Sequence, residues 1–244
     1  MKLVFIRHGD PDYEHDSLTE RGKKEAELLG KFLKKEKFPM DAVFCSPLGR
    51  ALLTCKIAQS YAGFEFETLP WLREFRGKID KPDRPVPDLC WDLPPKYFSE
   101  HPGLRQPQKW LEDPLIQAHN VPEEYEWVSK GLDEVLSRFG YERDGYLYRV
   151  KEANEKTLVF FCHFGVTSVM MGHLSGFSPY VFFQHFCART TSITTFASEE
   201  RQKGIASFRC FAFGETQHLK DGGMEPSFAA RFQETFLKKE EWDF

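Results

Sequence analysis

The sequence lacks several features that would assign it to a class at once. No apolar run approaches the roughly 20 residues of a membrane span, and the four-residue run after Lys2 is shorter than the core of a signal peptide, about 7–15 residues. The net charge is −4, from 33 basic and 37 acidic residues, so no basic surface indicates nucleic-acid binding. Repeats and low-complexity tails are absent. We expect a cytosolic (cytoplasmic) protein that binds neither membranes nor nucleic acid.

Cysteine pairs with the spacing of metal or redox sites are also missing. None of the cysteines forms a CxxC motif, and several lie in apolar, strand-like runs. Such thiols are typically buried and free, so we expect neither disulfides nor zinc ligands. The six residues are Cys45, Cys55, Cys90, Cys162, Cys187 and Cys210.

The first third of the chain alternates strand-like and helix-like segments, which is typical of parallel βαβ units. Its 244 residues, 41% of them hydrophobic, suffice for one large domain or for a domain with an inserted cap. We predict strands over 3–7, 42–45 and 66–69 and helices over 19–35, with Thr19 as its cap, and over 48–61.

The second half of the chain continues this pattern. We predict helices over 123–139, 166–174 and 228–242 and strands over 157–162, 191–197 and 205–213. The last two strands are close in sequence, so we expect an antiparallel pair at the edge of the sheet. The predicted fold is an α/β, three-layer α/β/α sandwich, formed as a single domain over 1–244, with a mostly parallel sheet and an antiparallel edge strand.

Residues 78–121 have a different composition. They contain eight prolines and the aromatic residues Trp91, Tyr97, Phe98 and Trp110. A long proline-rich loop inside a compact domain is uncommon unless it is functional, and about 45 residues make a poor independent core. We interpret this segment as a cap inserted over the active site. The alternative is a surface excursion packed by its own aromatic residues.

Two histidines follow buried-strand runs in similar settings. Arg7-His8-Gly9 comes directly after Leu3–Ile6, and His163-Phe164-Gly165 comes directly after Thr157–Cys162. The carboxyl ends of parallel strands meet at one rim, where ligands of open α/β sheets bind. We therefore expect one shared site.

Two further residues should join this rim. Arg50 falls on the first turn of a predicted helix, and Glu74 lies just past the third strand. Arginine donors match phosphate oxygens, and helix N-termini favour anions, so two arginines and two histidines predict a phosphoryl-binding pocket. The remaining histidines lack such a setting and are taken as structural or cap residues.

These residue types suggest a mechanism. A neutral His8, its other ring nitrogen held by a backbone carbonyl, attacks phosphorus and becomes a phosphohistidine. Arg7 and Arg50 lower the pKa of His8 and bind the oxygens with His163, which donates if it is protonated. The backbone N–H of Phe164 contacts the phosphate. A protonated Glu74 supplies the leaving alkoxide with a proton and then serves as base for water.

In these segments the chain resembles the histidine phosphatase superfamily, the phosphoglycerate-mutase-like proteins. The resemblance implies a phosphatase with no metal or organic cofactor, acting on a small phosphorylated substrate. The segments that carry it are Leu3–Gly9 with the RHG motif, Ser17–Gly22 with Glu25-Ala26, Ser46–Ala51 with Thr54 and Ile57-Ala58, Leu72-Arg73-Glu74, Phe161-Cys162-His163 and Gly214–Leu219.

The chain also departs from the family pattern. Gly77 follows Glu74 by three residues rather than the more common four, which makes Asp80 a reserve proton donor, and Phe164 replaces a frequent glycine. True mutases continue RHG with a Ser-x-Trp-Asn-like stretch, where this chain has Asp10–Tyr13. The RHGxRxP motif and the His-Asp pair of the acid-phosphatase branch are absent. The small-phosphatase branch fits best.

Other functions remain as alternatives. A phosphoglycerate-type mutase would need a bisphosphate primer, and a phosphoryl-ligand binding module would bind with little turnover. A metallohydrolase fits poorly, because the histidines lack compact ligand spacing. The natural substrate and the oligomeric state, with a homodimer as one option, are left open.

Overall fold

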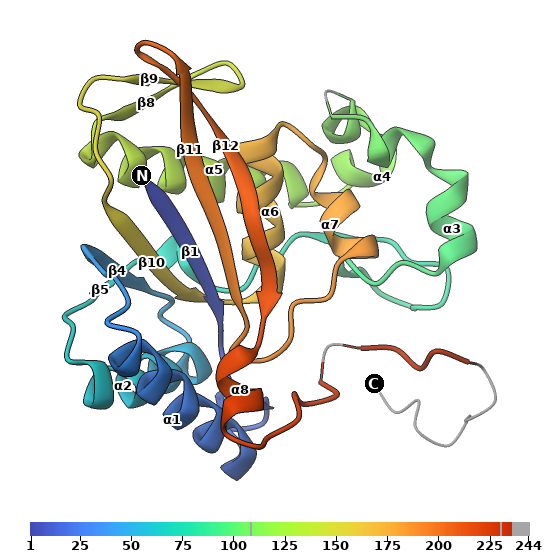
Figure 1. Ribbon diagram of the computed structural model, residues 1–244. Coiled ribbons are helices and arrows are strands. Elements are labelled where there is room, and N and C mark those ends of the chain that lie inside the picture. Colours follow the sequence, from blue (N-terminus) through green and yellow to red (C-terminus); the bar gives the residue numbers. More distant parts are fainter. Residues whose placement is uncertain (108, 230, 236–244) are drawn as a thin grey trace.

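A mixed eight-stranded sheet runs through the computed structural model, which describes residues 1–107, 109–229 and 231–235 (Figure 1). From one edge to the other, the strands are β5 (Glu67–Thr68), β4 (Ala42–Cys45), β10 (Thr157–Cys162), β1 (Lys2–Arg7), β11 (Ile193–Gln202), β12 (Ile205–Glu215), β9 (Leu147–Val150) and β8 (Tyr141–Asp144). The short pair of β2 (Pro11–Asp12) and β3 (Ser17–Leu18) lies outside this sheet.

The predicted α/β class, with a parallel sheet and an antiparallel edge, is confirmed, and the antiparallel part is larger than expected. β1, β10, β4 and β5 pair in parallel, whereas β11, β12, β9 and β8 continue the sheet antiparallel. The predicted β11–β12 pair forms, but it lies inside the sheet because the hairpin β8–β9 extends beyond it. The sequence signal for this hairpin, which the prediction missed, is Gly145. It is the first of the two residues that join β8 to β9, and its φ is +60°; a glycine with positive φ at this position is typical of a type II′ hairpin turn.

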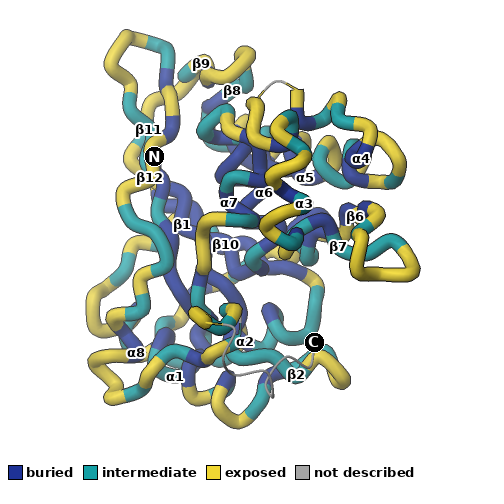
Figure 2. The backbone as a smooth tube through the Cα atoms, turned by 90° about the vertical axis from the view of Figure 1, so that its right-hand side faces the viewer, coloured by how far each residue is buried: buried dark blue, intermediate teal, exposed yellow. Residues whose placement is uncertain are grey.

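Side chains alternate along the central strands, so each strand supplies both faces of the sheet. Leu3 and Phe5 pack with Leu132 of α5 and Val166 of α6, whereas Val4 faces α1 and α2. These strands are the most buried part of the chain (Figure 2). The helices are α1 (Glu20–Lys35) and α2 (Gly49–Ala62) on one face and α5 (Val121–Arg138), α6 (Phe164–Ser175) and α7 (Pro179–His185) on the other.

The segment 78–121 packs onto the domain through the same core as α5 and α6. Its buried side chains include Phe98 and Leu104, and the ring of Trp110 meets Tyr125 of α5 at 4.9 Å between centroids. The segment contains β6 (Lys78–Ile79), β7 (Asp88–Leu89), α3 (Pro95–Glu100), α4 (Pro114–Gln117) and the 3-10 turns Pro102–Arg105 and Trp110–Glu112. Another 3-10 turn, Pro70–Leu72, precedes it.

Most predicted helix boundaries lie within two residues of the observed ones, but the helix predicted at the C-terminus is not observed in the described residues. The helix predicted over 228–242 falls partly on residues 230 and 236–244, which lie outside the described residues, and residues 231–235 form no helix. The last helix before this segment is the short α8 (Gln217–Asp221). The residues that follow α8 contact the first part of the chain, where Ser227 donates to Asp10 and Arg21 donates to the Glu225 carbonyl. Among the described residues, no helix is both long and apolar enough to cross a membrane.

The cysteine prediction is correct for four thiols and wrong for two. Cys45, Cys55, Cys90 and Cys162 are buried, and no disulfide joins any of the six described cysteines. Cys187 and Cys210 are exposed. Cys210 lies on β12, whose outer part is not covered by β9, because β9 pairs with β12 only at Ile205 and Ala206.

Replacing Thr19 with alanine should destabilise the protein by about 1–2 kcal/mol. The Thr19 hydroxyl oxygen accepts the N–H of Gly22 at 3.0 Å, as an N-cap does, and the hydroxyl donates to Asp10 at 2.7 Å. Thr19→Ser keeps the hydroxyl and should retain near-wild-type stability. Urea unfolding of the three proteins measures the difference, and equal stability of Thr19→Ala and wild type would contradict the capping role.

Candidate active site

The two strand-tip histidines meet because β1 and β10 are adjacent and in register. Arg7 pairs with Cys162, and the His8 N–H donates to the Cys162 carbonyl at 3.0 Å. The next residues on the two strands are therefore neighbours, with the rings of His8 and His163 5.1 Å apart between centroids. Both rings are buried.

His8 is held in a defined orientation and tautomer. Its Nδ1 donates to the carbonyl of Gly9 at 2.7 Å, which leaves Nε2 of the neutral ring with a free lone pair. Burial, followed by the positive charges of Arg7 and Arg50, lowers the pKa of His8 well below 6.5. At neutral pH the His8 ring is therefore uncharged, with the lone pair of Nε2 available.

His163 is also neutral and is fixed by Ser46. Its Nε2 lies 2.7 Å from the Ser46 hydroxyl, whose oxygen also accepts the N–H of Leu48. We assign the Ser46 hydroxyl as the donor to Nε2, which places the ring proton on Nδ1; this buried atom has no hydrogen-bond partner among the described residues. Burial, then the neighbouring charges, lowers the pKa of His163 well below 6.5. The hypothesis of a protonated His163 is unnecessary, because the neutral ring donates through Nδ1.

The two arginines are anchored at one end only. Arg7 donates through Nη1 to the carbonyl of Ala188 at 2.6 Å, and Arg50 donates through Nη1 to Asp16 at 2.7 Å. Nε of each guanidinium is buried and has no partner in the part of the chain that the structure describes. Buried donors are nearly always hydrogen-bonded, so three open N–H groups, counting Nδ1 of His163, form the donor set of an anion site.

Glu74 lies within reach of the charges of this cluster. Its Oε1 accepts the N–H groups of Phe75 at 2.9 Å and of Val166 at 3.1 Å. Burial raises the pKa of Glu74, although these N–H groups and the two arginines act in the opposite direction. A carboxyl with a raised pKa can carry a proton to transfer. Gly165 leaves room for this carboxyl, because a Cβ there would lie 2.7 Å from Glu74 Oε1.

The structure separates the remaining two candidates. Phe164 is the first residue of α6, with its ring 6.0 Å from the guanidinium carbon of Arg7, and its N–H belongs to the first turn. Asp80 is 65% exposed and pairs with His119 at 3.0 Å. The carboxylate of Asp80 is therefore engaged by His119 at the surface, and Glu74 is the candidate carboxyl that lies in the cluster.

Several residues that shape the cluster were not singled out for these roles from the sequence. Asp16 accepts from Arg50 and from the Gly49 N–H at 2.7 Å, and a Cβ at Gly49 would lie 2.0 Å from the Asp16 carbonyl. Asp16 and Arg50 are 34 residues apart, so no local pattern joins them. The others are Ser46 beside His163, Thr54 accepting from the Gly9 N–H, and Ala188 accepting from Arg7.

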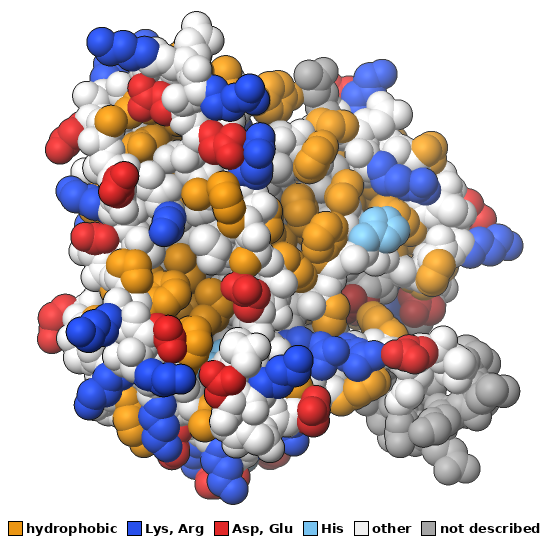
Figure 3. All heavy atoms as spheres, in the orientation of Figure 1, with side chains coloured by type: hydrophobic (Ala, Val, Ile, Leu, Met, Phe, Trp, Pro, Cys, Tyr) orange, Lys and Arg blue, Asp and Glu red, His pale blue; other side chains and the backbone are white. Residues whose placement is uncertain are grey.

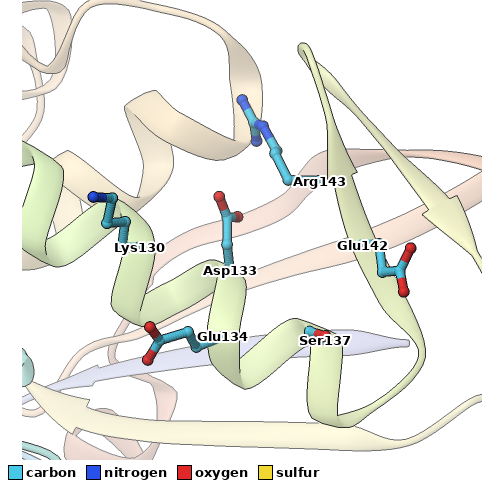
Figure 4. A pocket seen from close by; sticks show the side chains of 6 residues that line it. All are labelled: Lys130, Asp133, Glu134, Ser137, Glu142 and Arg143. Carbon is cyan, nitrogen blue, oxygen red and sulfur yellow. The ribbon is translucent and has the colours of Figure 1, made fainter.

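Two surface hollows lie elsewhere. One, of about 400 Å³, is lined by charged residues of α5 and β8 (Figure 4). There Asp133 accepts from Tyr148 and contacts His173 at 2.9 Å, which makes His173 a structural histidine. The other, about 560 Å³, is an apolar groove between β12 and the helices α6 and α7 (Figure 3). Within the described residues, no three His, Cys, Asp or Glu side chains are grouped as metal ligands.

An imidazole with an unprotonated Nε2, a set of buried N–H donors and a carboxyl with a raised pKa thus come together at one rim of the sheet, an arrangement suited to binding an anion. The model of the histidine phosphatase superfamily (branch 1) matches residues 3–210. The chain belongs to this superfamily.

Solved structures share the fold. Phosphoserine phosphatase from Entamoeba histolytica, in complex with 3-phosphoglyceric acid, has a TM-score of 0.57 and 19% identity, covering 89% of this chain and 98% of that chain. Mycobacterial glucosyl-3-phosphoglycerate phosphatase has a TM-score of 0.56 and 15% identity, covering 87% and 98%.

Curated relatives match a shorter segment. The 2,3-bisphosphoglycerate-dependent phosphoglycerate mutase of Pasteurella multocida is 42% identical in an alignment of 66 residues that covers 23% of this chain and 29% of the mutase. The corresponding mutase of Haemophilus influenzae is 41% identical in an alignment of the same length, with the same coverage of both chains. The chain thus matches under a third of the length of these mutases.

Because His8 and His163 are buried and neutral, the free energy of unfolding should fall below about pH 6.5. Their folded-state pKa values are lowered, so the unfolded chain binds more protons as the pH falls. The loss should reach at most about 1.4 kcal/mol per histidine for each pH unit. Urea unfolding at pH 7.5 and 5.5 measures it. The double variant His8→Gln, His163→Gln should show a smaller pH dependence, and an unchanged dependence would contradict this origin.

Proposed function

We propose that this protein is a metal-independent phosphomonoesterase that acts through phosphorylated His8 on a small phosphorylated metabolite. One observation carries the proposal. His8 has an unprotonated Nε2, and three N–H groups of its neighbours Arg7, Arg50 and His163 are buried without a partner among the described residues. A phosphoryl group would satisfy these donors and place phosphorus next to the nucleophile.

In the first step, Nε2 of His8 attacks phosphorus while the bond from phosphorus to the ester oxygen breaks. Arg7 and Arg50 neutralise the phosphoryl oxygens, and His163 donates through Nδ1. Protonated Glu74 gives its proton to the leaving oxygen, which departs as an alcohol rather than as an alkoxide. His8 then carries the phosphoryl group on Nε2 and keeps its Nδ1–H bond to the Gly9 carbonyl.

In the second step, water takes the place of the alcohol. The Glu74 carboxylate removes a proton from water as the oxygen attacks phosphorus, and the bond from phosphorus to Nε2 breaks. Inorganic phosphate leaves, His8 is again neutral, and Glu74 is again protonated. The chain's own residues therefore complete the cycle.

We further propose that the segment 78–121 is a cap over the leaving-group side of the site. Trp91 supports this assignment, because a Cβ at Gly165 would touch both the Trp91 ring and Glu74 Oε1. The ring also lies 5.7 Å from Phe183 of α7 between centroids. A wall of this kind excludes water from one side of the ester and selects among leaving alcohols.

A phosphoglycerate-type mutase is the second candidate, favoured by the identity with the curated mutases over 66 residues. A mutase returns the phosphoryl group to a bound hydroxy acid, whereas the proposed enzyme gives it to water. Conversion of 3-phosphoglycerate with and without 2,3-bisphosphoglycerate separates the two. Isomerisation that depends on the bisphosphate would replace the phosphatase proposal.

The wild-type protein should release phosphate from 4-nitrophenyl phosphate in the presence of EDTA, and His8→Ala should lower the rate by about a thousandfold or more. Rapid acid-free quenching of a ³²P-labelled ester should trap label on His8 in the wild type only. His15→Ala, which changes an exposed surface histidine, is the control. Phosphate release without label on a histidine would refute the covalent mechanism.

Glu74→Gln should slow hydrolysis of an alkyl phosphate by about 10²–10³-fold and hydrolysis of 4-nitrophenyl phosphate much less. Nitrophenolate leaves without a proton, so this ester bypasses the acid. Rapid-quench measurement of the phosphorylation step with both esters gives the comparison. Asp80→Asn should change neither rate. An equal loss for the two esters in Glu74→Gln would rule out the proton-donor role.

A further inference from the structure

Trp91 marks where the leaving alcohol would lie. A Cβ at Gly165 would be 2.9 Å from the Trp91 ring and 2.7 Å from Glu74 Oε1, so ring and carboxyl flank the same point. Under the proposed function, Glu74 protonates the leaving oxygen. The group attached to that oxygen therefore extends past Trp91.

Asp92, the next residue, presents a carboxylate without a partner. It lies in the left-handed region with φ +57° and is solvent-accessible, and within the described residues it forms no hydrogen bond or ion pair. Lys81 binds the Trp91 carbonyl at 2.8 Å and approaches Asp88 at 3.6 Å instead. A non-glycine residue held at positive φ costs free energy, and such residues gather at ligand-binding positions.

Asp92 also lies within electrostatic reach of the phosphoryl site. Burial raises the pKa of its carboxyl, and the charges of Lys81 and Arg7 lower it. The carboxyl is thus accessible to a ligand while protein atoms partly surround it. A cation from a bound substrate would stabilise its ionised form, whereas a substrate carboxylate would meet like charge.

Aromatic rings accompany the charged groups of the site. Phe164 lies beside Arg7, and Tyr13, which is 68% exposed, lies over Arg50 with 5.5 Å between the guanidinium carbon and the ring centroid. Trp91, whose ring lies near the Glu74 carboxyl, directly precedes Asp92 in the chain. Aromatic faces and a carboxylate attract organic ammonium groups.

We propose that the substrates are phosphomonoesters of amino alcohols, with the ammonium group bound between Asp92 and Trp91. This inference rests on the proposed function and adds the substrate class. Asp92 accepts a hydrogen bond from the ammonium, and the phosphoryl group occupies the Arg7 and Arg50 donors. The same arrangement disfavours esters whose alcohol carries a carboxylate, such as phosphoglycerate.

The test compares 2-aminoethyl phosphate with 2-hydroxyethyl phosphate. The two esters have the same length, and they differ only in that the first ends in an ammonium group and the second in a hydroxyl group. Wild-type kcat/KM should be about tenfold higher for the amino ester. Asp92→Asn should bring the two values close together, and asparagine tolerates positive φ, so the fold is retained. Asp83→Asn, on an exposed residue of the same segment, should keep the wild-type preference.

Equal kcat/KM values in the wild type, or a preference that survives in Asp92→Asn, would overturn the inference. Hydrolysis of 4-nitrophenyl phosphate, measured in parallel, shows whether the proposed phosphatase activity itself holds. If no ester is turned over, the proposed function fails. Calorimetric binding of the two esters to wild type and Asp92→Asn then decides this inference separately, and equal affinities for the two esters would overturn it.

Discussion

The parallel pairing of β1 with β10 is the interaction on which the site depends. Its register places Arg7 opposite Cys162, and the residues that follow, His8 and His163, emerge together. A slip of one residue would turn each strand's side chains to the other face. Because Phe5 and Phe160 pack on one face while Val4 and Val159 pack on the other, both layers of helices oppose such a slip.

The site concentrates polar groups where the fold otherwise buries apolar ones. Each buried N–H without a partner costs on the order of 1–3 kcal/mol, and Arg7, Arg50 and His163 each contribute one. Burial of apolar side chains in the surrounding sheet and helices stabilises the fold and offsets this cost. In the proposed function a bound phosphoryl group satisfies these donors, so the groups that destabilise the free protein would be those that bind the anion and stabilise charge during transfer.

Short polar contacts around the cluster determine what each group can do. The Gly9 carbonyl sets the tautomer of His8, Ser46 holds Nε2 of His163, and Asp16 orients Arg50. Arg7 is held by the Ala188 carbonyl, beyond α7. Substitution of a neighbour can therefore weaken phosphoryl binding without touching a substrate.

The sequence by itself determined the elements whose signals are local. The apolar runs of β1 and β10, the Thr19 cap of α1 and the residue types at the strand ends could be read directly. Tertiary structure alone decided the rest: the larger antiparallel half of the sheet, the exposure of Cys187 and Cys210, the surface pairing of Asp80, and the Ser46–His163 contact across 117 residues. Periodicity and turn chemistry act over a few residues, whereas these features depend on which distant segments pack together.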